Sequence, residues 1–265
     1  LIGTSHEQLI FDMTENMAYL FQRFGVIPNA SRYYFLSRSQ PPFFTTMIML
    51  CHKLMCEREE PGSNVFLRRM IEIAEKEYET VWLGTMQPHH RMVYAGLSRY
   101  FDINYLDMLA ACESGWDHST RFEDRVLEHL PVDLNSILMV CENDIATGHF
   151  MLGDIAASER WQAKAKQRAE AMTELMWDED LGFFFDYDFV NKRRTLSPSL
   201  AGFFPLWSGA ATKEQAKRMV DIWLPKFEKD GGLVTTLEIK AGRQWASPNG
   251  WAPLQWLVLA GLEKY

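Results

Sequence analysis

Apolar residues recur at helical spacing along most of this chain of 265 residues. A first helix is predicted over residues 9–24 because five apolar side chains there follow the 3.6-residue period, and a glycine and then a proline mark its end. Those five are Leu9, Met13, Met17, Leu20 and Phe24. Further helices are predicted over 41–59, 64–82, 134–145, 161–176, 199–207, 216–227 and 251–263. The pattern therefore predicts about eight helices, nearly all with one apolar face.

Two stretches depart from this pattern. Residues 83–121 are rich in Gly, His, Tyr and Asp without a regular apolar period, which predicts a mostly irregular segment. Residues 182–196 combine alternating aromatics and aspartates with a basic far side at 192–194, which predicts a short β-hairpin. Because no linker or low-complexity segment divides the chain, we expect one domain over residues 1–265.

Helices that alternate with long loops are typical of an all-α toroid of antiparallel helix pairs. In such a fold the inner helices line the centre and the loops build one face. The number of predicted helices is too small for a complete ring of twelve. We therefore expect an incomplete toroid that exposes apolar inner faces, which predicts poor solubility or pairing with another chain.

Composition excludes several classes of partner. The net charge of −8 argues against nucleic acid and anionic membrane surfaces, and no apolar run approaches the roughly 18 residues of a membrane span. The four cysteines (Cys51, Cys56, Cys112 and Cys141) show no disulfide framework. Cys51 and Cys56 lie at i, i+5, a poor spacing for metal ligands, so we expect buried free thiols. Free thiols favour a reducing compartment such as the cytoplasm.

The segment 113–121 reads Glu-Ser-Gly-Trp-Asp-His-Ser-Thr-Arg and carries the sharpest chemistry. Gly115 permits a tight turn or a close approach to a ligand, and Trp116 offers a flat face that suits a sugar ring. Desolvation beside that face can raise the pKa of Asp117, as a general acid requires. The segment predicts a carbohydrate site with Asp117 as the acid.

A loop at 27–42 supplies hydrogen-bonding groups for sugar hydroxyls. Asn29, Arg38, Ser39 and Gln40 lie in it between prolines that stiffen the chain. The alternative is a plain helix connection in which Ser39 caps the next helix.

A third segment, 244–256, holds three tryptophans around a Pro-Asn-Gly turn. Gln244 and Trp245 open this segment, and its indoles can wall a sugar pocket with little loss of entropy. The alternative is that the indoles fill the core, which we expect of Trp256. No metal site is predicted from His89–His90 or from the aspartates of 178–188, and no nucleotide or cofactor fingerprint is present.

These three segments together resemble the trehalases of glycoside hydrolase family 37. The family's second signature is Gln-Trp-Asp-x-Pro-x-Gly-Trp-x-Pro, and residues 244–253 read Gln-Trp-Ala-Ser-Pro-Asn-Gly-Trp-Ala-Pro. The similarity continues through 132–135, 185–188, 204–207 and 231–236. It implies an (α/α)6 barrel and an inverting hydrolase that cleaves α,α-trehalose to glucose. It also implies that Asp117 is the general acid and that Asn29, Arg38, Ser39, Gln40 and Gly115 contact the substrate.

Four departures from the family pattern qualify this expectation. The family's first signature and its catalytic base would lie outside this chain, so we expect a core fragment that lacks N- and C-terminal parts. An Arg-Pro-Glu triplet is missing from the stretch between Asp102 and Asp117, and Ala246 replaces an aspartate. Within the chain, Glu113, Asp133 and Glu238 are the stand-in candidates for the base. The alternatives are a hydrolase of glucosylglycerate or mannosylglycerate, and a non-catalytic carbohydrate-binding remnant.

Overall fold

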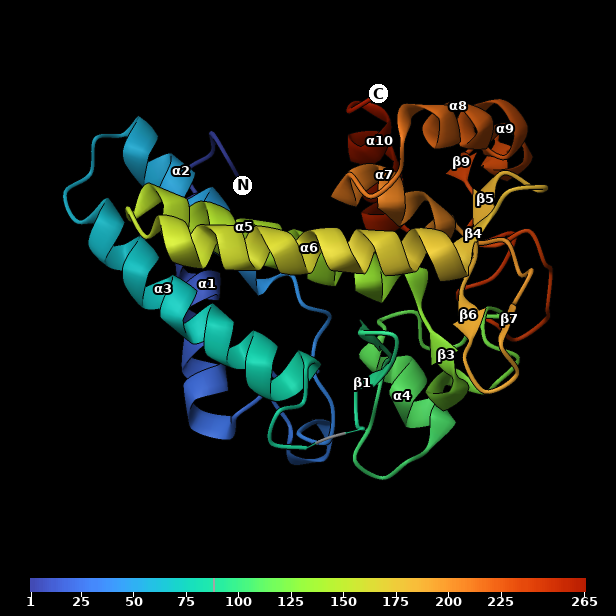
Figure 1. Ribbon diagram of the computed structural model, residues 1–265, viewed down its shortest axis with the longest axis horizontal. Coiled ribbons are helices and arrows are strands. Elements are labelled where there is room, and N and C mark those ends of the chain that lie inside the picture. The colour runs from blue at the N-terminus through green and yellow to red at the C-terminus, as the bar shows by residue number, and fades with distance from the viewer. Residues whose placement is uncertain (88) are drawn as a thin grey trace.

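The computed structural model describes residues 1–87 and 89–265, and helices dominate it (Figure 1). Helical spacing in the sequence located most of them, since the long predicted segments each correspond to a helix. The helices are α1 (Gln8–Phe24), α2 (Phe44–Glu57), α3 (Ser63–Glu77), α4 (Asp107–Glu113), α5 (Val132–Met151), α6 (Ile155–Met176), α7 (Phe204–Ser208), α8 (Lys213–Ile222), α9 (Leu224–Phe227) and α10 (Ala252–Leu262).

The helices α5 and α6 lie side by side and cross the middle of the molecule (Figure 1). Helix α5 is buried on nearly all sides because it also contacts α2, α3 and α7. Gly148 permits the close approach of α3, since a Cβ there would lie 2.6 Å from Cδ1 of Ile71. Helix α6 is capped by Asp154, whose side chain accepts a hydrogen bond from the amide of Ala157 at 3.0 Å.

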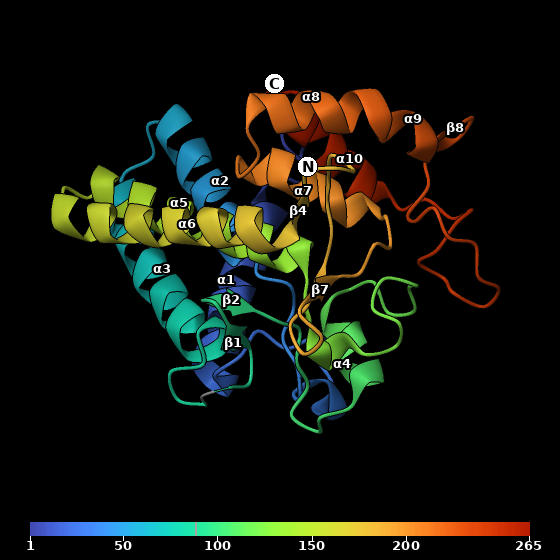
Figure 2. The same cartoon turned by 45° about the vertical axis from the view of Figure 1, so that its right-hand side comes forward.

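Two groups of helices flank this central pair. Helices α1, α2 and α3 lie on one side, and α7 to α10 lie on the other (Figures 1 and 2). Under α8 and α9, Phe183 packs against Phe203 and Trp223 with ring centroids 5.3 and 4.7 Å apart. The short α4, which leads into the 113–121 segment, lies on the other face of the central pair from α10 (Figure 1).

All strands are short and pair antiparallel. The predicted hairpin at 182–196 contains β6 (Tyr187–Asp188) and β7 (Arg193–Arg194), which pair with Tyr187 opposite Arg194. A third strand, β3 (His129–Leu130), extends this pair. The other pairs are β1 (Met92–Tyr94) with β2 (Leu97–Ser98), β4 (Trp177–Asp178) with β5 (Phe183–Phe184), and β8 (Glu228–Lys229) with β9 (Gly232–Leu233).

Several local expectations were wrong. The segment expected to be mostly irregular contains the short helix α4, which was not predicted, and the helix expected at 216–227 is divided into α8 and α9. Trp256 does not fill the core, because it is 59% exposed on the outer face of α10. Cys56 is exposed rather than buried. Ser39 does not cap α2, whose N-cap position is Phe43.

The apolar residues from which helix α1 was predicted are not the residues that it buries most deeply. Leu9, Met13 and Phe24 are 47, 49 and 43% exposed. The face turned toward the core presents Ile10, Thr14, Ala18 and Phe21 instead.

Candidate functional site

The Gly-Trp-Asp segment forms a tight turn directly after α4. Gly115 has φ +75° and Asp117 has φ +29°, so a non-glycine residue occupies the left-handed region. The amide of Trp116 donates to Oγ of Ser114 at 3.0 Å, and the Trp116 ring is buried. Strain of this kind persists only where the surroundings hold it.

The first support of this turn is Glu113, the residue at which α4 ends. Its fully buried carboxylate accepts the backbone amides of Ser39 and Phe101, each at 2.7 Å. It also accepts two hydrogen bonds from the Arg91 guanidinium, one of them 3.2 Å from Nε. Glu113 therefore ties the 27–42 loop and the 101 region to the turn. With its oxygens engaged in this way, it is unsuited to act as a base.

The second support is Arg121, which is buried below the turn. Its guanidinium donates to both oxygens of Asp133, at 2.8 and 3.0 Å, and of Asp186, at 2.8 and 3.1 Å. Burial lowers the pKa of Arg121, but the two carboxylates more than offset this and raise it above the ordinary value. The same guanidinium lies 4.3 Å from the centroid of Trp116. Asp133 is therefore held in an ion pair and is a poor base.

The 244–256 segment contacts the turn directly. The amide of Trp245 donates to the carbonyl of His118 at 3.0 Å. The Trp245 ring stacks on Trp251 with centroids 4.1 Å apart and planes 3° apart, and it lies 5.7 Å from Trp116. Gln244 is exposed, and its carbonyl accepts from the Trp251 indole at 3.2 Å. Two of the three predicted segments thus meet at residues 116–118 and 245.

The 27–42 loop reaches the turn through its polar side chains. Nδ2 of Asn29 donates to the carbonyl of Cys112 at 3.3 Å, and Nε2 of Gln40 donates to the carbonyl of Asn29 at 2.5 Å. Oγ of Ser39 donates to the carbonyl of Ile27 at 3.3 Å. Nη1 of Arg38 forms an ion pair with Asp102 at 3.1 Å. All three predicted segments are therefore neighbours in the fold.

The predicted site residues line three separate cavities. A cavity of about 350 Å³, here called the tryptophan cavity, is lined by Gln40, Gly115, Trp116 and Trp245. Asp117 lines a different cavity of about 400 Å³, here called the aspartate cavity. Arg38 lines a third, of about 360 Å³. The turn thus places the apolar platform on one side and the carboxyl group on the other.

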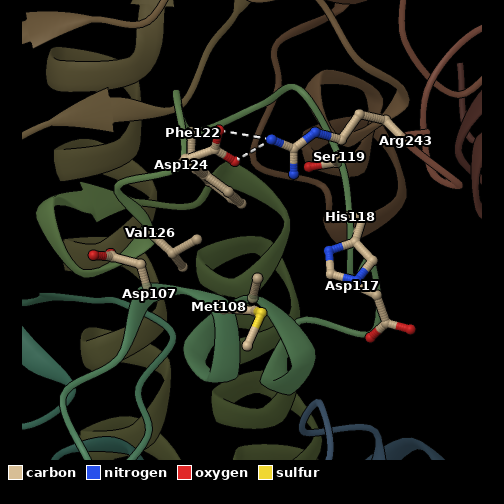
Figure 3. A pocket seen from close by; sticks show the side chains of 10 residues that line it. Asp107, Met108, Asp117, His118, Ser119, Phe122, Asp124, Val126 and Arg243 are labelled. Atoms are coloured by element: carbon tan, nitrogen blue, oxygen red, sulfur yellow. Dashed lines mark hydrogen bonds and ion pairs between the residues drawn. The ribbon is translucent and has the colours of Figure 1, made fainter. Parts of the chain in front are cut away.

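The aspartate cavity has a polar wall that sequence reasoning missed. Nη2 of Arg243 donates to both oxygens of Asp124, at 2.7 and 2.6 Å (Figure 3). This pair lies at one end of the cavity, Asp117 lies toward the other end, and His118 lies between them (Figure 3). On the inner side of the turn, burial raises the pKa of the Cys112 thiol, and the nearby Asp117 carboxylate raises it further.

Neither a metal cluster nor a membrane span is evident in the described residues. Within 1–87 and 89–265, no three side chains of His, Cys, Asp or Glu gather as a set of metal ligands. In the same ranges, no helix combines the length and apolar character needed to cross a bilayer. His90 stacks on Phe101 with centroids 4.4 Å apart.

Comparison with known proteins identifies the family. The sequence profile of the family described as Trehalase matches residues 1–109 and 102–265. The chain belongs to the trehalase family. Among family members, the cytosolic neutral trehalase of Beauveria bassiana (strain ARSEF 2860) is 34% identical over an alignment of 324 positions. The alignment covers 96% of this chain and 43% of that protein.

Solved structures confirm the (α/α)6 toroid. Neutral trehalase Nth1 from Saccharomyces cerevisiae superposes with a TM-score of 0.87 at 33% identity, over 97% of this chain and 57% of that one. A mannosylglycerate hydrolase of family GH63 from Thermus thermophilus, in complex with glucose, shares the fold alone. Its TM-score is 0.67 at 20% identity, over 86% of this chain and 63% of that one. The chain spans about half the length of its trehalase relatives.

Proposed function

We propose that this chain supplies the acid half of an inverting trehalase active site, with Asp117 as the general acid. In this mechanism Asp117 protonates the oxygen between the two glucose units while a water attacks the anomeric carbon from the opposite face. The substrate is α,α-trehalose, and the products are two glucose molecules. Family membership supports the reaction class, and the relatives from Beauveria bassiana and Saccharomyces cerevisiae are trehalases.

The observation that carries the proposal is the rigid support of Asp117. Its turn is fixed by Glu113 on one side and Arg121 on the other, and it is bonded to the Trp245 segment. An acid held rigidly in this way can protonate a substrate without first ordering its own loop. Gln40, Gly115, Trp116 and Trp245 are the proposed glucose-binding wall. Asn29, Arg38, Ser39 and Gln244 remain predicted substrate-binding residues.

The base is assigned to a carboxylate outside residues 1–265. A base must have a lone pair free to accept a proton from water. Glu113 and Asp133 are both committed to buried guanidinium groups. Glu238 lies in the loop before the tryptophan segment and lines neither the tryptophan cavity nor the aspartate cavity. The two carboxyl groups of an inverting pair stand about 6.5–9.5 Å apart, a space that a small anion can enter when the base is missing.

Chemical rescue with azide tests the acid role on the chain as it is. Azide bonds to the anomeric carbon from the β face, the C1–O bond breaks, and Asp117 gives its proton to the departing oxygen. Trehalose is thereby converted to β-glucosyl azide and glucose. We expect this product by NMR from the unaltered chain and from the control Glu238→Gln, and none from Asp117→Asn. Trehalose binding without any azide product would refute the acid role and favour a binding remnant.

A further inference from the structure

Two aspartates of the hairpin at 182–196 each bind an arginine. Asp186, which directly precedes β6, accepts hydrogen bonds from Arg121. Asp188, in β6, accepts from Nη2 of Arg125 at 3.0 Å. Both carboxylates are buried, and both arginines belong to the segment that follows the Gly-Trp-Asp turn. The hairpin therefore holds this segment at two points.

Asp186 is itself fixed in place. Its backbone carbonyl accepts the amide of Thr195 across the hairpin at 3.0 Å. Its Oδ1 also accepts the amide of Val132, the first residue of α5, at 2.9 Å. A carboxylate at the N-terminus of a long helix is favoured by the helix dipole. Asp186 thus links the hairpin and the start of α5 to the guanidinium of Arg121.

The Arg121 guanidinium is fixed in its plane and lies against two rings. Its Nε and Nη2 donate to Asp186, and its Nη1 and Nη2 donate to Asp133. Two carboxylates on two edges of a planar cation define its orientation. Its central carbon lies 4.3 Å from the ring centroid of Trp116 and 4.6 Å from that of Phe122.

The backbone of Asp117 depends on such support. Its φ of +29° is a conformation that a non-glycine residue keeps only when its surroundings enforce it. Trp116 directly precedes Asp117, and its buried ring lies against Arg121. A tilt of the guanidinium would therefore move the peptide bond that leads into the acid.

We infer that Asp186 is a positioning residue for the proposed acid. By fixing the plane of Arg121 it holds the ring of Trp116, and Trp116 in turn holds the carboxyl group of Asp117 in its reactive orientation. This inference rests on the proposed function. Asp186 lines neither the tryptophan cavity nor the aspartate cavity, so it acts without touching the sugar. Asp133 binds the same guanidinium but lines the tryptophan cavity, so a substitution there would mix positioning with binding.

Azide rescue, measured beside trehalose binding, tests this role in Asp186→Asn. The amide keeps the size of the side chain and one acceptor, but it loses the charge that orients Arg121. At saturating trehalose, we expect the rate of β-glucosyl azide formation to fall about 10²-fold, because a displacement of about 1 Å at a reacting group can cost that much. The Kd of trehalose, followed by tryptophan fluorescence, should stay within about threefold, since the residue lines neither cavity.

The matched control is Asp188→Asn. Asp188 is the second buried carboxylate of the hairpin, and it accepts the amide of Asn191 at 2.8 Å as well as the guanidinium of Arg125. The other carboxylate partners of Arg125 are Glu123 and Glu128. Both Asp→Asn variants should lower the urea midpoint of unfolding, but the control should keep its azide rate within about threefold, because its arginine does not hold the turn.

Arg121→Lys gives a second test that leaves a cation between the two carboxylates. The ammonium retains the charge but has no planar face to lie against Trp116. We expect the azide rate to fall as in Asp186→Asn while the Kd of trehalose is kept. If Asp186→Asn does not fold, Arg121→Lys decides the question.

The outcomes distinguish this inference from the proposed function. Unchanged azide rates in Asp186→Asn and Arg121→Lys, or an equal fall in Asp188→Asn, would overturn the positioning role and leave the acid role of Asp117 standing. A fall in rate that is matched by an equal rise in the Kd of trehalose would make Asp186 a determinant of binding and would also overturn it. The absence of azide product from the unaltered chain would refute the proposed function, and this inference with it.

Discussion

The two buried networks that hold the Gly-Trp-Asp turn are built in opposite ways. Glu113 is an anion whose partners are one guanidinium and two backbone amides. Arg121 is a cation whose hydrogen-bond partners are two side-chain carboxylates. Backbone amides stay in place when a neighbour is substituted, whereas the two carboxylates around Arg121 are buried charges that depend on it. The network centred on Arg121 should therefore be the more sensitive of the two.

The largest effect is expected from removing the cation. Arg121→Met leaves Asp133 and Asp186 buried without their counter-ion, which should cost about 3–5 kcal/mol in the free energy of unfolding. Urea denaturation measures it. The control is Arg193→Met, at a surface pair of which the arginine is 54% exposed; it should cost less than about 1 kcal/mol. A loss of similar size in both variants would contradict the view that the burial of Arg121 and its two carboxylates sets the cost.

The next effect is a pH dependence that comes from Glu77, a buried neighbour of the Glu113 network. Burial raises the pKa of Glu77 from 4.5 to about 7, although the Trp82 indole and the charge of Arg91 oppose the shift. The folded protein therefore binds this proton more tightly than the unfolded chain. The resulting stability is complete below about pH 4.5 and is lost as the pH rises through 7.

Glu77→Gln should remove this part of the pH dependence. The free energy of unfolding of the unaltered chain should fall by up to ~3 kcal/mol between pH 4.5 and 7.5 from this group. The decrease of the free energy of unfolding with pH should be smaller in Glu77→Gln. It should be unchanged in the control Glu79→Gln, because Glu79 is exposed. Urea denaturation across this range decides the matter, and identical slopes in all three proteins would disprove the contribution of Glu77.

A smaller loss is expected at the anion centre. Glu113→Gln keeps the shape of the side chain but turns one acceptor into a donor, which then faces Arg91 or a backbone amide. The cost should be about 3 kcal/mol, at the low end of the range for a broken buried ion pair, because one buried charge, Arg91, loses its counter-ion, whereas Arg121→Met leaves two carboxylates without theirs. Urea denaturation of Glu113→Gln and Arg121→Met under the same conditions tests which variant loses more stability. A greater loss in Glu113→Gln would reverse the ranking of the two networks.

The sequence predicted the segments of this site but not the contacts that join them. Helical spacing located α5 and α6 because their apolar periods run over many turns. Helix α4 was missed because seven residues are too few to establish a period. The motif at 113–121 was visible locally. Its supports were not, because Asp186 lies 65 positions from Arg121 and Arg91 lies 22 positions from Glu113.

The position of Arg38 was not predictable for the same reason, because its partner is distant in sequence. The loop composition indicates donors for sugar hydroxyls, and the resemblance implies a substrate contact. In the fold, Arg38 pairs with Asp102 and lines a cavity apart from Asp117 and the tryptophans. Asp102 is 64 positions away in sequence, so no local pattern could reveal that pairing. Its role in substrate binding remains a prediction.

The smallest effect is expected at Trp116, which is connected to both networks. Its ring lies 4.3 Å from the Arg121 guanidinium, whereas its chain connection runs through Ser114 to Glu113. If the ring belongs energetically to the cation network, a double-mutant cycle of Trp116→Phe with Arg121→Lys should give a coupling of about 1 kcal/mol. The cycle with Glu113→Gln should give about zero, since the ring makes no direct contact there. Equal coupling in the two cycles would mean that the networks act as one unit through the turn.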